Sequence, residues 1–406
     1  MQKQMEDNSE FNIPEDQLKK IKSQEEFEDF FSKLYKQGVE ALLKAEMDEH
    51  LGYKKHDPKG KNSGNNRNGT SGKILKTNLG EIPLDVPRDR NSTFEPIAIP
   101  KHQRMSSKIE KAILTMYSKG MSTRDIEESV KDIYGIKVSE SSISSITGVV
   151  LEDVRQWQQR PLEPIYYVVW MDGIVMKVRQ NGKVINKTIY LIIGLNKEGY
   201  KEVLGMWIGE TESASLWMSV LNDLKERGVE DILIACTDNL AGIKQAILAI
   251  YPQASTQLCI VHQIRNSVRY VSWKERKQFL TDLKAVYTAI NRDMAWEALQ
   301  DFESKWGSKY AYAIKSWKDN WDYLTVYFDY PKEIRSMIYT TNAVESLNSS
   351  VRKYTRSKLI FPDDQAALKS VYLAVMNTER KWTQQIRNWG QVLNQFVIIF
   401  ENRCRL

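Results

Sequence analysis

The stretch Ile165-Tyr-Tyr-Val-Val-Trp-Met-Asp172 decides the expected fold. It is an apolar run that is interrupted by a carboxylate. Runs rich in β-branched and aromatic residues predict β-strands. A bare carboxylate inside such a strand is costly unless it is paired or binds a cation. The alternative is an aspartate on an edge strand that faces water. Asp172 is therefore the first candidate for metal chemistry.

The residues after Pro164 predict alternating strands and helices in the order β-β-β-α-β-α-β. Three strands in a meander, followed by crossovers through helices, predict an α/β fold with a mixed five-stranded sheet covered by helices. Asn181-Gly182 is a typical hairpin turn. The expected strands are 164–178, 184–195, 202–208, 232–236 and 257–261, and the expected helices are 213–224 and 240–250.

Two further acids have settings that suit metal binding, although each has a structural alternative. Asp238 follows strand 232–236, and open α/β sheets bind ligands at the carboxyl ends of their strands. Asp238 could instead cap the next helix. Glu345 lies in a helix-like stretch, where Asn342 three residues earlier also fits a capping box. Three carboxylates in one cleft would suit Mg²⁺.

The helix expected around Glu345 has two unlike faces. Its polar face carries Glu345, Asn348, Ser349, Arg352 and Arg356, whereas Val344, Leu347, Val351 and Tyr354 form an apolar face that can pack on the sheet. An acid followed by arginines suits phosphodiester chemistry. Two hard cations about 3.5–4 Å apart can activate the attacking oxygen and stabilise the leaving oxygen.

Cys259 and His262 form a C-x-x-H pair. Zinc needs about four ligands and no second pair is evident, so zinc is disfavoured. His262 could hydrogen-bond a phosphate or support an active-site acid, and a purely structural histidine is the alternative. Cys236 fits a small core residue.

The N-terminal part predicts disorder over 1–15, a helix over 16–51 and a strand over 82–86. Between them, 53–78 is rich in Gly, Asn and Lys. This stretch is either a solvated loop or a basic arm that follows a phosphate backbone. The candidate DNA contacts in the arm are Lys54, Lys55, Lys59, Lys61 and Arg67.

Residues 106–157 predict three short helices, with Ser122 and Asp125 as a capping box. This spacing fits a helix-turn-helix DNA-binding module, and a helical domain used only for packing is the alternative. The outward face of the third helix offers Ser141 and Ser145 but no Arg or Lys, so strong recognition of guanine is not evident.

Composition limits the class of protein. A chain of 406 residues with 42% hydrophobic and 27% charged residues predicts two to four soluble domains, and the net charge of +6 is compatible with nucleic-acid binding. Three cysteines indicate a reducing compartment. Neither a signal peptide nor an apolar run of about 18 residues is evident, so we expect a cytoplasmic, nucleoid-associated protein without membrane contact.

Four motifs together resemble the bacterial insertion-sequence transposases of the Mutator type. They are Tyr167-Val-Val-Trp-Met-Asp172-Gly, Cys236-Thr-Asp238-Asn-Leu-Ala-Gly, Cys259-Ile-Val-His262-Gln-Ile-Arg-Asn and Thr340-Thr-Asn-Ala-Val-Glu345-Ser-Leu-Asn. The stretch Leu79-Gly-Glu-Ile-Pro-Leu-Asp-Val-Pro-Arg-Asp-Arg90 also looks like the family's N-terminal region. The resemblance covers roughly residues 35 to 400 and is specific because the motifs occur together.

The resemblance implies a ribonuclease-H-like catalytic domain whose DDE triad would be Asp172, Asp238 and Glu345. These three acids would also bind the metal, two Mg²⁺ ions for which Mn²⁺ can substitute. Cys259, His262, Asn348 and Arg352 would be supporting residues, and Arg352 with Arg356 would contact DNA. The tryptophans in the helical stretch 266–335 fit the core of a helical bundle better than a role in base stacking.

These expectations combine into a transposase that binds terminal inverted repeats, cleaves strands and joins them to target DNA, as a homodimer or larger assembly. A ribonuclease-H-like nuclease that does not join strands and a non-catalytic DNA-binding regulator are the alternatives. The expected parts are an N-terminal helical segment that is a candidate interface (1–52), a basic linker with short strands (53–105), the helix-turn-helix domain (106–160), the first part of the core (161–265), a helical insertion (266–335), and the glutamate helix with C-terminal helices (336–406).

Overall fold

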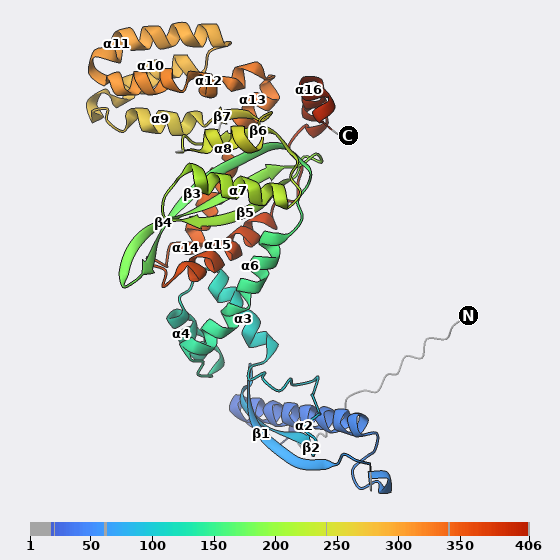
Figure 1. Ribbon diagram of the computed structural model, residues 1–406. Coiled ribbons are helices and arrows are strands. Elements are labelled where there is room, and N and C mark those ends of the chain that lie inside the picture. The colour runs from blue at the N-terminus through green and yellow to red at the C-terminus, as the bar shows by residue number, and fades with distance from the viewer. Residues whose placement is uncertain (1–17, 20, 61–62, 241, 340–341, 405–406) are drawn as a thin grey trace. The chain divides into compact units, whose positions relative to one another are not determined.

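The computed structural model describes residues 18–404, apart from residues 20, 61–62, 241 and 340–341 (Figure 1). Residues 1–15, which we expected to be disordered, and Lys61 lie outside the described residues. The chain divides into two compact units. The first lies within 1–117 and 121–147, and the second within 118–120 and 148–406.

In the first unit, a long helix packs on a two-stranded ribbon. Helix α2 (Gln24–Leu51) begins at Ser23, whose hydroxyl accepts a 3.2 Å hydrogen bond from the Glu26 N–H, so the helix starts later than the expected residue 16. Strands β1 (Arg67–Thr77) and β2 (Gly80–Asp89) pair antiparallel. A small core joins the helix to the ribbon, and its buried members are Val39, Leu43, Leu75, Ile82, Leu84 and Ile99.

Strand β1 corrects the prediction of a loop or arm over 53–78. Strand 82–86 needs a partner for its backbone N–H and C=O groups, and 67–77 supplies it in the register Leu75↔Ile82. The many Gly, Asn and Lys residues concealed this strand, because these residue types are depleted in strands. Of the described residues in this stretch, those before Arg67 keep the character of a basic loop, with a short 3₁₀ helix η1 (Pro58–Gly60).

Four helices follow the ribbon where three were expected. They are α3 (Ser107–Ser118), α4 (Thr123–Tyr134), α5 (Glu140–Gly148) and α6 (Val150–Gln159). The predicted capping box of α4 is present, with Ser122 and Asp125 bonded reciprocally. Helix α6 belongs to the second unit, whereas we expected its residues to continue the third helix of the first.

A mixed five-stranded sheet forms the centre of the second unit and confirms the predicted sheet. Its strands are β3 (Ile165–Gln180), β4 (Lys183–Leu195), β5 (Lys201–Gly209), β6 (Asp231–Thr237) and β7 (Ser255–Leu258). Their order is β5-β4-β3-β6-β7. The first three strands pair antiparallel, and β6 and β7 continue the sheet parallel to β3. Asn181 and Gly182 have φ of 50° and 76°, as the predicted hairpin turn requires.

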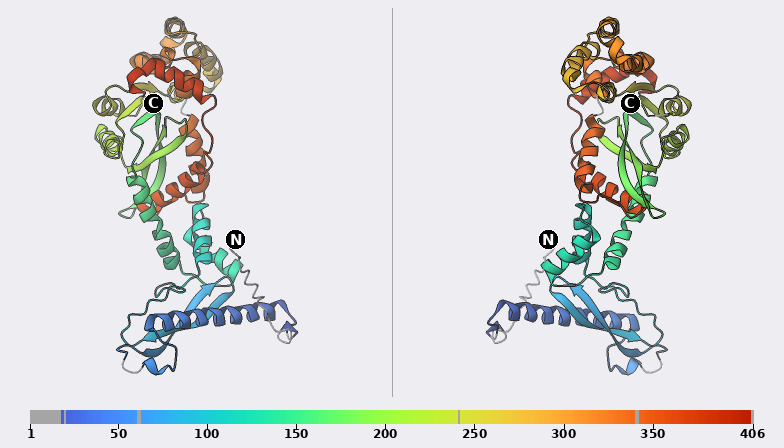
Figure 2. Two further views of the ribbon diagram at one scale, coloured as in Figure 1. Left: turned by 90° about the vertical axis from the view of Figure 1, so that its right-hand side faces the viewer. Right: turned by 90° about the vertical axis from the view of Figure 1, so that its left-hand side faces the viewer.

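Helices cover both faces of this sheet (Figure 2). Helices α7 (Ala214–Glu226) and α8 (Ile243–Ile250) pack on one face through buried residues such as Trp217 and Ile247. Helices α14 (Asn342–Thr355) and α15 (Asp364–Glu379) pack on β3 and its neighbours from the other side. The apolar face predicted for α14 is correct, since Val344, Leu347 and Val351 are fully buried.

Helices fill the chain between β7 and α14, as predicted. They are α9 (Ile260–Val268), α10 (Trp273–Tyr287), α11 (Arg292–Asp319), α12 (Trp321–Leu324), the 3₁₀ helix η2 (Val326–Asp329) and α13 (Lys332–Ile338). Trp306 and Trp317 are buried in this part, whereas Trp273 is 83% exposed. The last elements among the described residues are α16 (Trp389–Phe400) and the 3₁₀ helix η3 (Glu401–Arg403).

The predicted strand 257–261 is too long at its carboxyl end. Strand β7 stops at Leu258, and the Cys259 N–H makes the last ladder contact, a 2.8 Å hydrogen bond to the Thr237 carbonyl. Cys259 is then the N-cap of α9, so His262 lies in the first turn of a helix. Among the described helices, none is long and apolar enough to span a membrane.

Candidate metal centre

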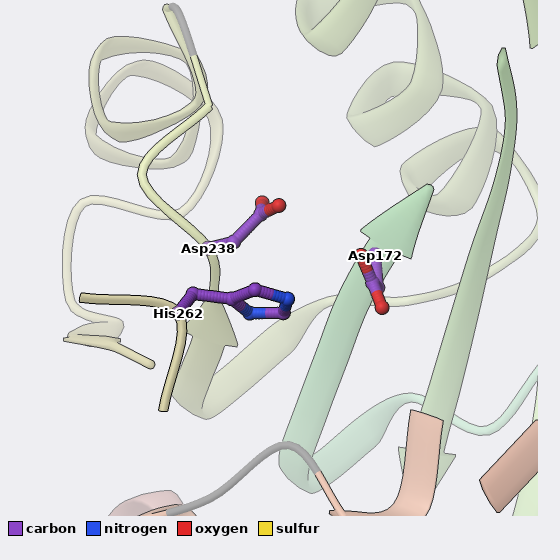
Figure 3. Close-up of side chains that lie close together, drawn as sticks. All are labelled: Asp172, Asp238 and His262. Atoms are coloured by element: carbon purple, nitrogen blue, oxygen red, sulfur yellow. The ribbon is translucent and has the colours of Figure 1, made fainter. Parts of the chain in front are cut away.

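The parallel pairing of β3 and β6 brings Asp172 and Asp238 together. Met171 is the register partner of Thr237, so the residue after each lies at the same edge of the sheet. His262 reaches this place from the first turn of α9. Asp172, Asp238 and His262 can each offer a ligand atom, and these atoms all lie within 4.8 Å of one another (Figure 3). The structure thus brings together two of the three predicted acids and one predicted supporting residue.

Asp172 is buried and held by two hydrogen bonds. The Gly173 N–H donates to Oδ1 at 2.7 Å, and the Asn348 side-chain amide donates to Oδ2 at 2.6 Å. Burial is the main cause that raises the pKa of Asp172, and Glu345 adds to it, while Gly173, His262 and Arg352 oppose it. Asp172 is therefore not the water-facing edge residue of the alternative interpretation.

Asp238 is the more perturbed of the two acids. Burial, followed by the negative charge of Asp172, raises the pKa of Asp238 to about 8. Its Oδ1 and the Oδ1 of Asn348 are buried, and neither has a hydrogen-bond partner within the described part of the chain. Buried oxygens without partners are costly, and hard divalent cations take oxygen ligands. The residues present therefore fit Mg²⁺ or Mn²⁺.

His262 carries positive charge into this acidic site. A hydrogen bond with Cys259 is the largest cause that raises the pKa of His262 to about 9, and Asp172 and Asp238 add to it against the effect of burial. The two residues of the C-x-x-H pair therefore interact, with Cys259 at the N-cap of α9 and His262 in its first turn. Neither Cys259 nor Cys236 belongs to the three-residue group.

Glu345 lies beside this group and outside it. One of its carboxylate oxygens is 2.7 Å from the Arg265 guanidinium of α9. Glu345 is still near enough to Asp172 to raise its pKa, and Asn348, one turn further along α14, bonds Asp172 directly. Helix α14 therefore carries Glu345 to the site, with its charge paired to Arg265. The capping alternative concerns the Asn342 side chain, which lies outside the described part.

Glu212 is an acid near the site that the sequence did not reveal. It precedes α7, and burial followed by the charge of Asp172 raises its pKa. Glu212 in turn contributes to the raised pKa of Asp238. The only sequence signal was its position directly before the helix cap Ser213, at the end of the β5–α7 connection.

The predicted DNA contacts fall on both units. Lys54, Lys55, Lys59, Ser141 and Ser145 are exposed in the first unit, and Arg352 and Arg356 are exposed in the second. Arg67 differs, because its guanidinium pairs with Asp48 and donates a 2.7 Å hydrogen bond to the Tyr53 carbonyl. The role of Arg67 within the described structure is to tie β1 to the end of α2.

A mixed sheet with two aspartates and a histidine at one edge defines an α/β protein with a candidate metal centre. Residues 7–385 match the family described as “Transposase, Mutator family”. The chain belongs to the Mutator family of transposases.

Three relatives of this chain are also described as transposases. A probable transposase for insertion sequence element ISRM3-like from Sinorhizobium fredii is 43% identical over 90% of this chain and 90% of its own. The transposase for ISRM3 from Rhizobium meliloti is 42% identical over 90% of each chain. The transposase for IS905 from Lactococcus lactis is 32% identical over 94% of this chain and 97% of its own.

Proposed function

We propose that this transposase cleaves DNA at the ends of an insertion sequence and joins the freed ends to target DNA, with Asp172, Asp238 and Glu345 as the acidic triad. The carrying observation is the convergence of Asp172 and Asp238 from neighbouring parallel strands. The strand order β5-β4-β3-β6-β7, with β4 antiparallel to β3, supports a ribonuclease-H-like core. The three helices α3, α4 and α5 support a helix-turn-helix module.

In this proposal Asp172 and Asp238 hold one or two Mg²⁺ ions, and Mn²⁺ substitutes. When bound, the ions supply Lewis-acid stabilisation of the attacking and leaving oxygens. Asn348 fixes one oxygen of Asp172, so this carboxylate presents a defined orientation. His262, charged and adjacent, balances the two aspartates in the protein without metal.

Glu345 is the third ligand in this proposal, and its present partner Arg265 is exposed on the surface. Arg265 is 58% exposed and Glu345 is 27% exposed, so solvent weakens this ion pair to about 1 kcal/mol, and Glu345 can leave Arg265 at a modest cost. A turn of the Glu345 side chain within α14 toward Asp172 then completes the acidic set. Arg352 lies two turns along the same helix and would bind a DNA phosphate.

The test uses a labelled duplex of the inverted repeat that borders the gene, incubated with Mg²⁺, with every cut and joined strand mapped. We expect Asp172→Asn, Asp238→Asn and Glu345→Gln to abolish both cutting and joining while DNA binding persists. Glu226→Gln is the matched control, because Glu226 is an exposed acid at the end of α7. Cutting without joined products in the wild type would favour a nuclease, and activity that survives Asp172→Asn would contradict the triad.

Joining two element ends requires at least two copies of the chain, and α2 is our candidate interface. Three large apolar side chains are exposed along this helix: Phe27 at 47%, Tyr35 at 37% and Leu42 at 58%. Their spacing of eight and seven residues places them on one stripe, as in helices that pair along a seam. The stripe borders the buried face of the helix, where Val39, one turn after Tyr35, and Leu43 pack on the ribbon.

A further inference from the structure

A basic groove of about 710 Å³ lies beside the candidate metal centre in the second unit. Its walls are the second half of β3, the end of α14 and the connection from Thr355 to Phe361. On β3 the groove begins at Ile174, two residues after Asp172. On α14 it begins at Ser349, directly after Asn348. The groove therefore continues from the site along both elements that build it.

The charged residues of this groove are all positive. Its thirteen lining residues include five cations and no carboxylate, and the cations are Lys177, Arg352, Lys353, Arg356 and Lys358. No acid lines the groove, and the charge of Arg352 lowers the pKa of the nearby Asp172. Burial, followed by the nearby charge of Lys369, lowers the pKa of Lys358 to about 8. Like charges gathered without acids favour an anionic occupant.

An apolar tip projects at the groove. Leu359 is 80% exposed and Ile360 is 44% exposed, and Val175 on β3 is 61% exposed. Single exposed apolar residues are ordinary, whereas a cluster surrounded by cations indicates an interaction surface. A surface that binds by charge alone needs no apolar side chains. The exposed tip beside the cations therefore indicates an occupant that has both negative charge and apolar faces.

The backbone fixes this tip in place. The Phe361 N–H donates to the Lys177 carbonyl and the Arg179 N–H donates to the Phe361 carbonyl, both at 2.9 Å. The Phe361 side chain is buried. Before the tip, the backbone N–H of Lys358 donates to the Thr355 carbonyl at 2.9 Å. The Lys358 ammonium donates to the Ser370 hydroxyl at 3.0 Å. Leu359 and Ile360 are thus held outward between two anchored residues.

We propose that this groove holds the DNA next to the scissile phosphate, and that Leu359 and Ile360 contact bases unstacked there. DNA has both properties that the surface demands, a phosphate backbone for the cations and base faces for the apolar tip. Apolar side chains that enter a base step unstack it and distort the duplex. This inference rests on the proposed function and adds the place where the substrate is bound and deformed.

The test measures binding in EDTA, so that no strand is cut. The probe is the bordering inverted-repeat duplex with 2-aminopurine beside the scissile phosphate. We expect Lys353→Ala with Arg356→Ala to reduce the slope of log affinity against log salt by about 2, because each phosphate contact contributes about 0.9. Lys225→Ala with Lys332→Ala, two exposed cations outside the groove, should keep the wild-type slope.

The tip has its own readout. The wild type should increase 2-aminopurine fluorescence on binding, and Leu359→Ser with Ile360→Ser should remove the increase while the salt slope stays unchanged. Leu248→Ser with Ile398→Ser is the matched control, since these residues are 65% and 75% exposed and lie outside the groove. An unchanged salt slope in the cation variant, or an unchanged fluorescence in the tip variant, would overturn the inference.

Two further outcomes distinguish DNA binding in the groove from pairing of copies through the tip and from a failure of the proposed function. If the tip variant dissociates the oligomer in light scattering and keeps the fluorescence increase, the tip is an interface between copies and the inference is wrong. A wild-type protein that shows the expected binding signals in EDTA but neither cuts nor joins with Mg²⁺ would contradict the proposed function alone.

Discussion

The side-chain amide of Asn348 donates a 2.6 Å hydrogen bond to Oδ2 of Asp172, across 176 residues of sequence. This bond ties α14 to β3 at the candidate metal centre. The helix that carries Glu345 is thereby fixed in rotation against the strand that carries Asp172. The position of one predicted acid relative to another thus depends on a neutral side chain.

Replacing Asn348 should weaken metal binding without unfolding the protein. In Asn348→Ala, Asp172 loses one of its two hydrogen-bond donors, and we expect the Mg²⁺ dependence of strand cleavage to shift by about 10- to 100-fold. Ser346→Ala is the control, because Ser346 is exposed on the same helix. An unchanged Mg²⁺ titration with Asn348→Ala would show that the bond serves packing alone.

Metal affinity should increase with pH up to about 8. Asp238, whose pKa is raised to about 8, must lose its proton before it can bind a cation, so protons compete with Mg²⁺ below that pH. Calorimetric titration of the wild type with Mg²⁺ from pH 6 to 9 measures this. In His262→Ala the loss of a nearby positive charge should move the curve to higher pH. A flat wild-type curve over this range would contradict the prediction.

Removing Arg265 should release Glu345. The pair is exposed on the arginine side, so its net worth is about 1 kcal/mol at most, and Arg265→Ala should raise Mg²⁺ affinity by no more than about five-fold. The measurement is the Mg²⁺ titration of cleavage. Arg269→Ala is the control, because Arg269 is an exposed arginine one turn further along, at the end of α9. If cleavage is lost at saturating Mg²⁺ while metal affinity is unchanged, Arg265 contacts DNA instead.

The first unit should lose stability in acid through Asp89. Burial alone would raise the pKa of this carboxyl, but donors from Asn65, Thr93 and the Phe94 N–H hold it well below its usual range. A depressed pKa stabilises the fold at pH above the unfolded value of about 4. That contribution is lost as pH falls from there toward the folded value.

Asp89→Asn reveals this contribution. At pH 7 we expect the variant to reduce the stability of the ribbon by about 1–3 kcal/mol. The difference from the wild type should shrink as the pH falls below about 4, where the unfolded aspartate takes up its proton. Hydrogen exchange of strands β1 and β2 measures it, and Asp85→Asn, an exposed neighbour on β2, is the control. A difference that grows in acid would contradict the assignment.

Disrupting the α2 stripe should dissociate the assembly. In Leu42→Asp a charge replaces a side chain that is 58% exposed, so the fold should survive while pairing of copies fails. Light scattering gives the mass, and circular dichroism checks the fold. Lys44→Asp, an exposed position on the same helix, is the control. An unchanged mass with Leu42→Asp would exclude this stripe as the interface.

Local patterns predicted the sheet well, because long apolar runs such as 165–171 have few alternatives to a strand. The strand that carries Asp172 and the short strand before Asp238 were both placed to within a few residues. Strand β1 was missed because its Gly and Lys residues are stabilised by pairing with β2, which propensity does not register. The predicted strand extends to Val261, directly before His262, because Cys259-Ile-Val has strand character, whereas α9 begins after its N-cap Cys259.

The site was less predictable than the sheet. Its two aspartates follow from strand ends, but the hydrogen bond of Asn348 to Asp172 and the pairing of Glu345 with Arg265 are contacts between distant segments. Glu212 had only a weak sequence signal. Such contacts depend on how elements pack, and periodicity within one element does not contain that information.

The register of β3 against β6 has one last consequence. Because side chains alternate across a sheet, a slip by a single residue would turn Asp238 to the opposite face from Asp172. A chain with a slipped or unfinished sheet would therefore carry both aspartates and still lack the centre. Under the proposed function, a newly made chain would cut DNA only after β3 and β6, which are separated by the whole β4–β5–α7 segment, have paired in this register.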